Sequence, residues 1–181
     1  DKRRLCDYYV CSSRNPQLTG FLNYDYSSNT YLGKIINYGC RYIELDIFSK
    51  DVRIDSEPVV SSGDKVYQGQ NVIPCEEVFH LLKRTVFLRD RVDNYRDPFF
   101  IYLNLKTDNV NVMNRLYEII KGTISDVLLT DSFGINVGNM RMCELMDKIV
   151  LFASSNIMES KLKEVVTLVP GETNYIKRIE Y

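Results

Sequence analysis

Histidine is the scarcest chemistry-bearing residue in this sequence, because the 181 residues contain only one, His80. Any mechanism that uses two imidazoles, and any metal site built from several histidines, is therefore excluded. Five cysteines are present, but no two of them form a Cys-x-x-Cys pair. An odd number of cysteines without that spacing argues against a disulfide framework and a structural zinc site, and it favours a reducing compartment.

Long apolar runs and an excess of charge of one sign are also missing. No apolar stretch approaches the roughly 20 residues of a membrane-spanning helix, and no segment has the pattern of a signal peptide. Lys and Arg together number 23 and Asp and Glu 24, which gives a net charge of -1. Because nucleic-acid binders carry a basic footprint, we expect no nucleic-acid partner, and we expect a protein that is not secreted.

Apolar residues make up 45% of the chain, which is enough to form the core of one domain of this length. Strand patterns alternate with helical patterns, and this alternation predicts an α/β fold with parallel strands. The predicted strands are 8–12, 40–48, 58–61, 99–106 and 148–153, and the predicted helices lie near 29–39, 74–86 and 112–120.

The strand predicted at 40–48 carries two carboxylates on one face. Alternation along a strand places Glu44 and Asp46 on the same side, roughly 6.6 Å apart. Paired carboxylates suit a hard cation such as calcium or acid–base catalysis, and they are also common at the solvent-exposed end of a strand. If they face an interior instead, they need a cation, a polar partner or a raised pKa.

Three segments together resemble the X region of phosphoinositide-specific phospholipase C, in order as well as spacing. They are 12–20, 39–46 (GCRYIELD) and 57–63 (EPVVSSG). The resemblance extends over residues 8–155 and implies the first half of a distorted TIM barrel, an α/β fold of the phospholipase C X-domain type. We therefore expect an X-like domain at 1–155 and a C-terminal tail at 156–181.

The resemblance implies a barrel mouth that cleaves inositol phospholipids with two histidines and a calcium ion, but both histidine positions are replaced. The first falls on Arg14 and the second on Ser62. Arginine keeps its proton and cannot act as a base, and Ser62 has no histidine to activate it. His80 points away from the apolar stripe of its predicted helix and toward solvent. We therefore predict a pseudoenzyme without catalytic residues.

The metal and substrate sites implied by the resemblance are also incomplete. The calcium-ligand positions keep three residues of the family's type and replace a glutamate by an amide: Asn15, Glu44, Asp46 and Asn104. The positions of two substrate-binding lysines hold Phe152 and Ser154. We therefore expect no cofactor, with calcium bound only if the protein is an enzyme. We expect Arg14 or Lys106 to lie within about 4 Å of a carboxylate as an internal cation.

The chain is also short for a closed barrel, which needs at least about 200 residues. Half a barrel exposes unpaired strand edges, so we expect the isolated chain to self-associate and other protein chains to cover it. Our leading hypothesis is a catalytically inactive module that serves as a structural or interaction subunit of a larger assembly, such as the capsid of a large DNA virus. Its location would then be the cytoplasm or a virion.

Two other functions stay open from the sequence. The chain is an active phosphoric diester hydrolase on inositol lipids if calcium binds at Asn15, Glu44 and Asp46 and an unrecognised base is present. Alternatively, it binds lipid headgroups without cleaving them and touches the membrane peripherally. The aromatic loop 21–26 lies where the family's barrel rim contacts the membrane, although packing within the loop is the better explanation of these side chains.

Overall fold

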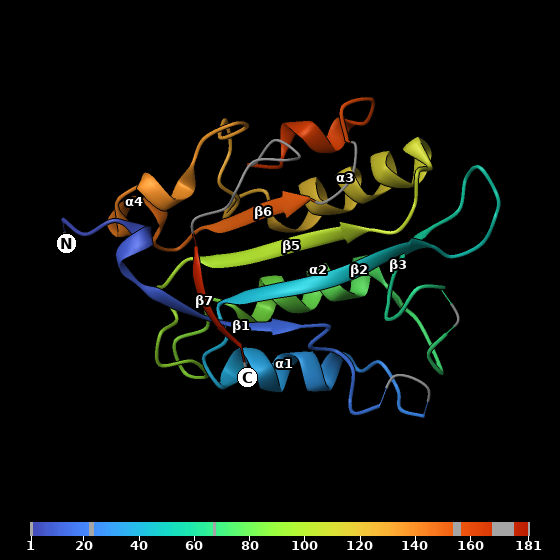
Figure 1. Ribbon diagram of the computed structural model, residues 1–181, viewed down its shortest axis with the longest axis horizontal. Helices are drawn as coiled ribbons and strands as arrows, with labels where there is room; N and C mark the ends of the chain where they lie inside the picture. Colours follow the sequence, from blue (N-terminus) through green and yellow to red (C-terminus); the bar gives the residue numbers. More distant parts are fainter. Residues whose placement is uncertain (1, 22–23, 67, 154–156, 168–175, 181) are drawn as a thin grey trace.

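The structure is a computed structural model and describes residues 2–180 apart from 22–23, 67, 154–156 and 168–175 (Figure 1). Its strands are β1 (Tyr9–Arg14), β2 (Tyr42–Ser49), β3 (Pro58–Ser61), β4 (Ile73–Pro74), β5 (Phe99–Leu105), β6 (Ile149–Ala153) and β7 (Lys177–Glu180). Its α-helices are α1 (Asn29–Asn37), α2 (Cys75–Thr85), α3 (Val110–Ile124) and α4 (Met142–Leu145), and its 3-10 turns are η1 (Leu5–Asp7), η2 (Val137–Asn139) and η3 (Lys161–Glu164).

The strands form one open sheet whose centre is β2. Strands β1 and β5 flank β2 in parallel, and β6 continues the sheet beside β5, also in parallel. Strand β3 pairs with β2 in the opposite direction, beyond the point where β1 ends. Only residues 50–57 connect β2 to β3, which is too short for a parallel crossover of a dozen or more residues. The predicted α/β, half-barrel-like fold is confirmed, with β3 as an antiparallel exception.

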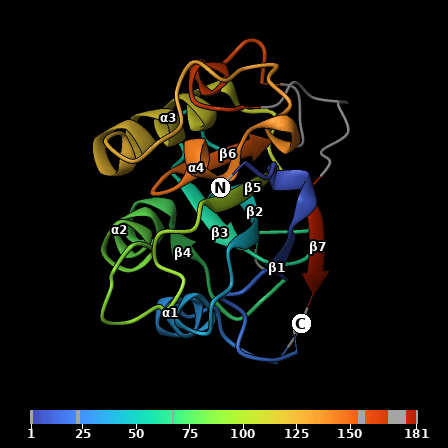
Figure 2. The same ribbon diagram turned by 90° about the vertical axis from the view of Figure 1, so that its left-hand side faces the viewer.

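Helices α1, α2 and α3 cover one face of the sheet (Figure 2). Their apolar stripes pack against the residues of β2 that alternation had assigned to one side, Ile43, Leu45 and Ile47, all fully buried. His80 lies on the exposed side of α2, next to Glu76, as predicted. None of the described helices is long and apolar enough to cross a membrane.

The opposite, inner face of the sheet holds a second apolar cluster. Tyr42 of β2, Phe100 of β5 and Phe152 of β6 stack with ring centroids 6.1–6.2 Å apart. Ile176, which directly precedes β7, is buried in the same cluster. The C-terminal residues predicted as a tail therefore pack against the sheet.

Strands β1 and β6, at the two sides of the parallel strands named above, form further hydrogen bonds within the chain. Strand β7 pairs in parallel with β1, and Ile179 lies opposite Cys11. Along β6, the amides of Leu129 and Thr167 donate to the carbonyls of Ile149 and Leu151, each at 2.8 Å. Within the described residues, the edges of β1 and β6 are therefore covered by the chain itself, but the sheet stays open and β7 becomes an edge strand. The sequence signal for β7 is weak because four residues with little alternation do not define a strand.

Candidate functional site

A pocket of about 430 Å³ opens where β1, β3 and β5 end beside the middle of β2. We call it the mouth pocket; it is lined by Arg14, Asn15, Leu18, Gly20, Asp46, Ser62, Gly63, Asp64 and Lys106. Its position at the carboxyl ends of the parallel strands is where barrels and other α/β folds place their ligands. The pocket brings together Arg14 and Ser62, at the positions where the resemblance implies histidines, and two of the predicted metal-ligand positions, Asn15 and Asp46.

Asp46 is the buried polar centre of this site, with 2% of its surface exposed. Its carboxylate accepts hydrogen bonds from Asn15 Nδ2 at 3.0 Å and from Asn104 Nδ2 at 2.6 Å. Asn15 can reach it because the chain turns directly after β1 with a φ of 47°, a left-handed conformation that asparagine tolerates better than most residues. Three predicted ligand positions therefore come together.

Glu44, the fourth predicted ligand position, has a different partner from Asp46. Its Oε1 is ion-paired with Nη1 of Arg178, which comes from β7. The same guanidinium lies 4.9 Å from the ring centroid of Tyr42. Burial raises the pKa of Tyr42, and the positive charge of Arg178 opposes that rise. A cation does pair with Glu44, but it is Arg178, whose side chain is 37% exposed.

The expectation that Arg14 or Lys106 forms this ion pair is wrong. Both side chains are exposed and line the mouth pocket, and neither forms an ion pair with Glu44 or Asp46. The sequence could not reveal the true partner, because Arg178 lies 134 residues from Glu44 and the pairing of β7 with β1 brings them together.

The predicted calcium ligands, as the structure places them, do not fit a calcium ion. Calcium takes about six to eight oxygen ligands. Here the amides of Asn15 and Asn104 direct N–H groups at Asp46, and Glu44 is paired with a guanidinium. Asn15 Oδ1 is buried without a hydrogen-bond donor. In the part of the chain that is described, no three His, Cys, Asp or Glu side chains converge on a common point.

Ser62 is held by a residue that sequence reasoning missed. Gln17 is fully buried, and its Nε2 donates to Ser62 Oγ at 3.0 Å and to the carbonyl of Ser61 at 3.3 Å. Gln17 stands in a polar loop where nothing in the pattern distinguishes it. The hydroxyl of Ser62 therefore has an amide partner, while the lone imidazole, His80, lies on the exposed side of α2.

Phe152, one of the two predicted substrate positions, does not line the mouth pocket. Phe152 is buried in the aromatic stack of the inner face, paired in register with Tyr102. Ser154 lies outside the described residues. An aromatic ring at position 152 offers no charge to a phosphate, so this position contributes to the core instead.

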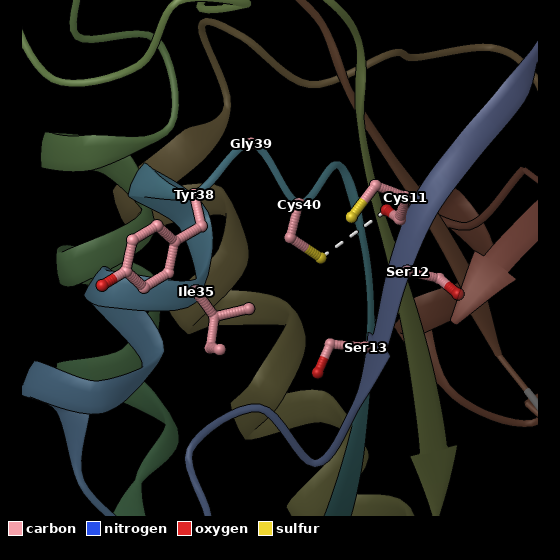
Figure 3. Close-up of a pocket in the computed structure, with 7 residues that line it drawn as sticks. All are labelled: Cys11, Ser12, Ser13, Ile35, Tyr38, Gly39 and Cys40. Carbon is pink, nitrogen blue, oxygen red and sulfur yellow. Dashed lines mark hydrogen bonds between the residues drawn. The ribbon is translucent and has the colours of Figure 1, made fainter. Parts of the chain in front are cut away.

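A second pocket, of about 410 Å³, lies between β1 and α1 and contains two thiols (Figure 3). The thiol of Cys40 donates to the carbonyl of Cys11 at 3.6 Å. Burial, aided by the neighbouring Cys11, raises the pKa of Cys40 to about 12. Because the thiolate is the reactive form, Cys40 behaves as a small apolar group.

Comparison with known proteins places this geometry in a family. Residues 2–155 match the family described as phosphatidylinositol-specific phospholipase C, X domain. A mouse protein named 1-phosphatidylinositol 4,5-bisphosphate phosphodiesterase eta-1 is 25% identical over 138 residues, covering 76% of this chain and 7% of that protein. The chain thus spans a small fraction of the curated relatives that it matches.

Two solved structures share the fold. PLC21 from L. pealei superimposes with a TM-score of 0.67 at 21% identity, over 85% of this chain and 19% of that one. A calcium-dependent phosphoinositol-specific phospholipase C from Pseudomonas sp. gives a TM-score of 0.61 at 14% identity, over 96% of this chain and 68% of that one.

Proposed function

Because the chain belongs to the phosphatidylinositol-specific phospholipase C X-domain family, we propose that it is a catalytically inactive member that serves as a structural or interaction subunit of a larger assembly. The carrying observation is that Arg14 and Ser62 stand at the two histidine positions while the only histidine lies on the outer side of α2. One positioned acid or base contributes about two to four decades of rate, and here both are replaced.

The hydrogen bonds and ion pairs of the other polar groups at the predicted site support this proposal. Asp46 accepts from two amides, Glu44 pairs with a guanidinium, and Ser62 accepts from Gln17. The partners of these groups are thus amides and a guanidinium, and none is an imidazole that could act as a general base. The assembly that we put forward as a concrete case is a virion, such as the capsid of a large DNA virus.

A non-cleaving headgroup binder is the second candidate, and the rim of the mouth pocket favours it. Arg14 and Lys106 line that pocket together with Asp46 and Asp64, and each of the two exposed cations can pair with a phosphate group. Nearby, Phe21 and Tyr24 of the aromatic loop are 80% and 79% exposed. Exposed aromatic side chains beside basic residues suit the surface of an anionic membrane.

The test of inactivity is inositol phosphate release from vesicles that contain phosphatidylinositol or its 4,5-bisphosphate, with calcium present. We expect release at the level of a buffer blank. The double variant Arg14→His, Ser62→His should also stay at that level, because Phe152 still replaces a substrate-binding position. Calcium-dependent turnover by the unaltered chain would overturn the proposal and favour the active hydrolase.

Vesicle flotation separates the headgroup binder from the subunit. If the mouth pocket binds headgroups, the chain floats with vesicles rich in anionic phosphoinositide, and the double variant Arg14→Glu, Lys106→Glu does not. A matched control replaces Lys83 and Lys121 by Glu, since both lie on helices of the opposite layer. Absence of flotation for all three proteins supports the subunit.

A further inference from the structure

The free edge of β1 accepts a strand from the C-terminal end of the chain. Strand β7 runs parallel to β1, with Tyr9 opposite Lys177 and Cys11 opposite Ile179. In a closed eight-stranded barrel, the first strand pairs in parallel with the second and with the last. Strand β7 therefore takes the position, and the direction, that the last strand of a complete barrel would have.

Neighbouring basic residues of β7 face opposite sides of the sheet. Lys177 lies over the exposed Tyr9, with its Nζ 5.7 Å from the ring centroid. Arg178 instead reaches the inner face, where it meets the carboxylate of Glu44 and the ring of Tyr42. Burial of Ile176 in the inner cluster fixes the start of the strand.

We propose that β7 is the chain's own closing strand and that Arg178 is the resident cation of the inner face, paired with Glu44 at one of the calcium-ligand positions that the resemblance implies. Glu44 is only 21% exposed, so its charge requires a partner. The guanidinium supplies that charge through a charge-assisted hydrogen bond, and it also lies over an aromatic face. A half barrel thus closes one edge and neutralises its interior with one strand.

This inference is independent of whether the chain is active, and its tests do not measure phosphodiester cleavage. The first test uses the register of β1 and β7. Cross-strand partners have Cα separations within the range that a disulfide spans, so Ile179→Cys should bond to the native Cys11. With diamide as oxidant, two thiols lose two protons and two electrons to form the S–S bond, and diamide becomes the hydrazine.

We expect Ile179→Cys to lose two free thiols and to remain a monomer on a non-reducing gel, with mass spectrometry locating the bond between positions 11 and 179. The same variant with Cys11→Ser is the control and should not form it. Failure of the cross-link would overturn the placement of β7. Covalent dimers joined through the same two positions would show that the closing strand comes from another copy, which also overturns the proposal.

The second test compares Arg178→Gln with Lys177→Gln, which remove the same charge from adjacent positions on opposite faces. We expect Arg178→Gln to lower the thermal midpoint by about 2–6 °C, while Lys177→Gln changes it by less than about 1 °C. Arg178→Lys should recover part of the loss, because an ammonium keeps the charge without the planar geometry.

Terbium(III) luminescence provides a readout that a merely structural role would not move. Terbium is a hard cation that prefers carboxylate oxygens, as calcium does. Removal of the guanidinium frees Glu44, so Arg178→Gln should bind terbium at least about tenfold more tightly than the unaltered chain, and Lys177→Gln should not. Equal affinities in the unaltered chain and in Arg178→Gln would show that Arg178 does not occupy the cation site.

Discussion

The two halves of the inner face of the sheet differ in how they are filled. In one half, Tyr42 and Phe100, near the amino ends of β2 and β5, form a buried aromatic stack with Phe152 of β6. Toward the carboxyl ends, Asp46 and Asn104 carry amide and carboxylate groups that bond to one another. Both halves use β2 and β5, and Asp46 lies only four positions after Tyr42 in β2.

The two halves are therefore stabilised in different ways. The aromatic half gains its stability from apolar area removed from water. The polar half contributes less, because each hydrogen bond there replaces one with water, but loss of a single partner leaves a buried group unsatisfied. Changes in the aromatic half should therefore alter stability most, whereas changes in the polar half should also alter the response to ions and pH.

Phe100→Ala should give the largest effect. The ring is fully buried between Tyr42 and Phe152, and large-to-small substitutions of buried aromatic residues cost about 3–5 kcal/mol. Urea denaturation measures the loss in the free energy of unfolding. Phe21→Ala, in the exposed aromatic loop, is the matched control and should change it by less than about 0.5 kcal/mol. Similar losses in both variants would contradict the packing described for the inner face.

Asp46→Ala should cost less, about 1–3 kcal/mol, since it leaves the amides of Asn15 and Asn104 without their acceptor. Asp64→Ala removes another carboxylate that lines the mouth pocket, but an exposed one, and should be close to neutral. The same urea titration compares them. If the two variants were equally stable, the hydrogen bonds to Asp46 would carry no net stability.

Asn104→Asp should make the polar half respond to calcium. The new carboxylate faces Asp46, so like charges repel in the absence of a cation. We expect the variant to be less stable in a chelator and to regain about 1 kcal/mol when calcium is several-fold above its dissociation constant. The unaltered chain should show no such gain in thermal melts with and without calcium. A gain of the same size in the unaltered chain would contradict the conclusion that its predicted ligands do not fit a calcium ion.

The smallest expected effect is a pH dependence at the loop after β2. Hydrogen bonds from Arg53, foremost that of its side chain, lower the pKa of Asp51 to about 2. Because the unfolded value is about 3.9, the stabilisation is complete above that pH and is lost as the pH falls toward 2. Asp51→Asn should therefore be slightly less stable than the unaltered chain at pH 6 and equal to it near pH 2. A difference that persists at pH 2 would point to another cause.

Local pattern was sufficient for the core of the fold. The alternation of 40–48 identified both faces of β2, and the period of the helix that contains Val78 and Leu82 identified its buried stripe. Element boundaries moved by one or two residues for β1, which begins at Tyr9 and ends at Arg14, and by up to four for α3, which ends at Ile124. These features depend on neighbours in the sequence, so the sequence alone reveals them.

The partners of the site residues could not be found in the same way. Asn15, Asp46 and Asn104 do converge, because parallel strands align their carboxyl ends. The resemblance to a family marked these positions. It could not reveal the hydrogen bond from Gln17 to Ser62 or the ion pair between Arg178 and Glu44. Each of those contacts depends on a loop or strand whose own sequence pattern is weak.

By itself, the sequence determined that one imidazole is present, that Arg14 and Ser62 stand at the two histidine positions implied by the resemblance, and that Glu44 and Asp46 share a face. These are facts of residue identity and of strand period. Only the tertiary structure decided that β7 covers the edge of β1 and that a guanidinium, Arg178, reaches Glu44. Strand pairing between the two ends of the chain depends on long-range backbone hydrogen bonds, and these leave no periodic signal in the sequence.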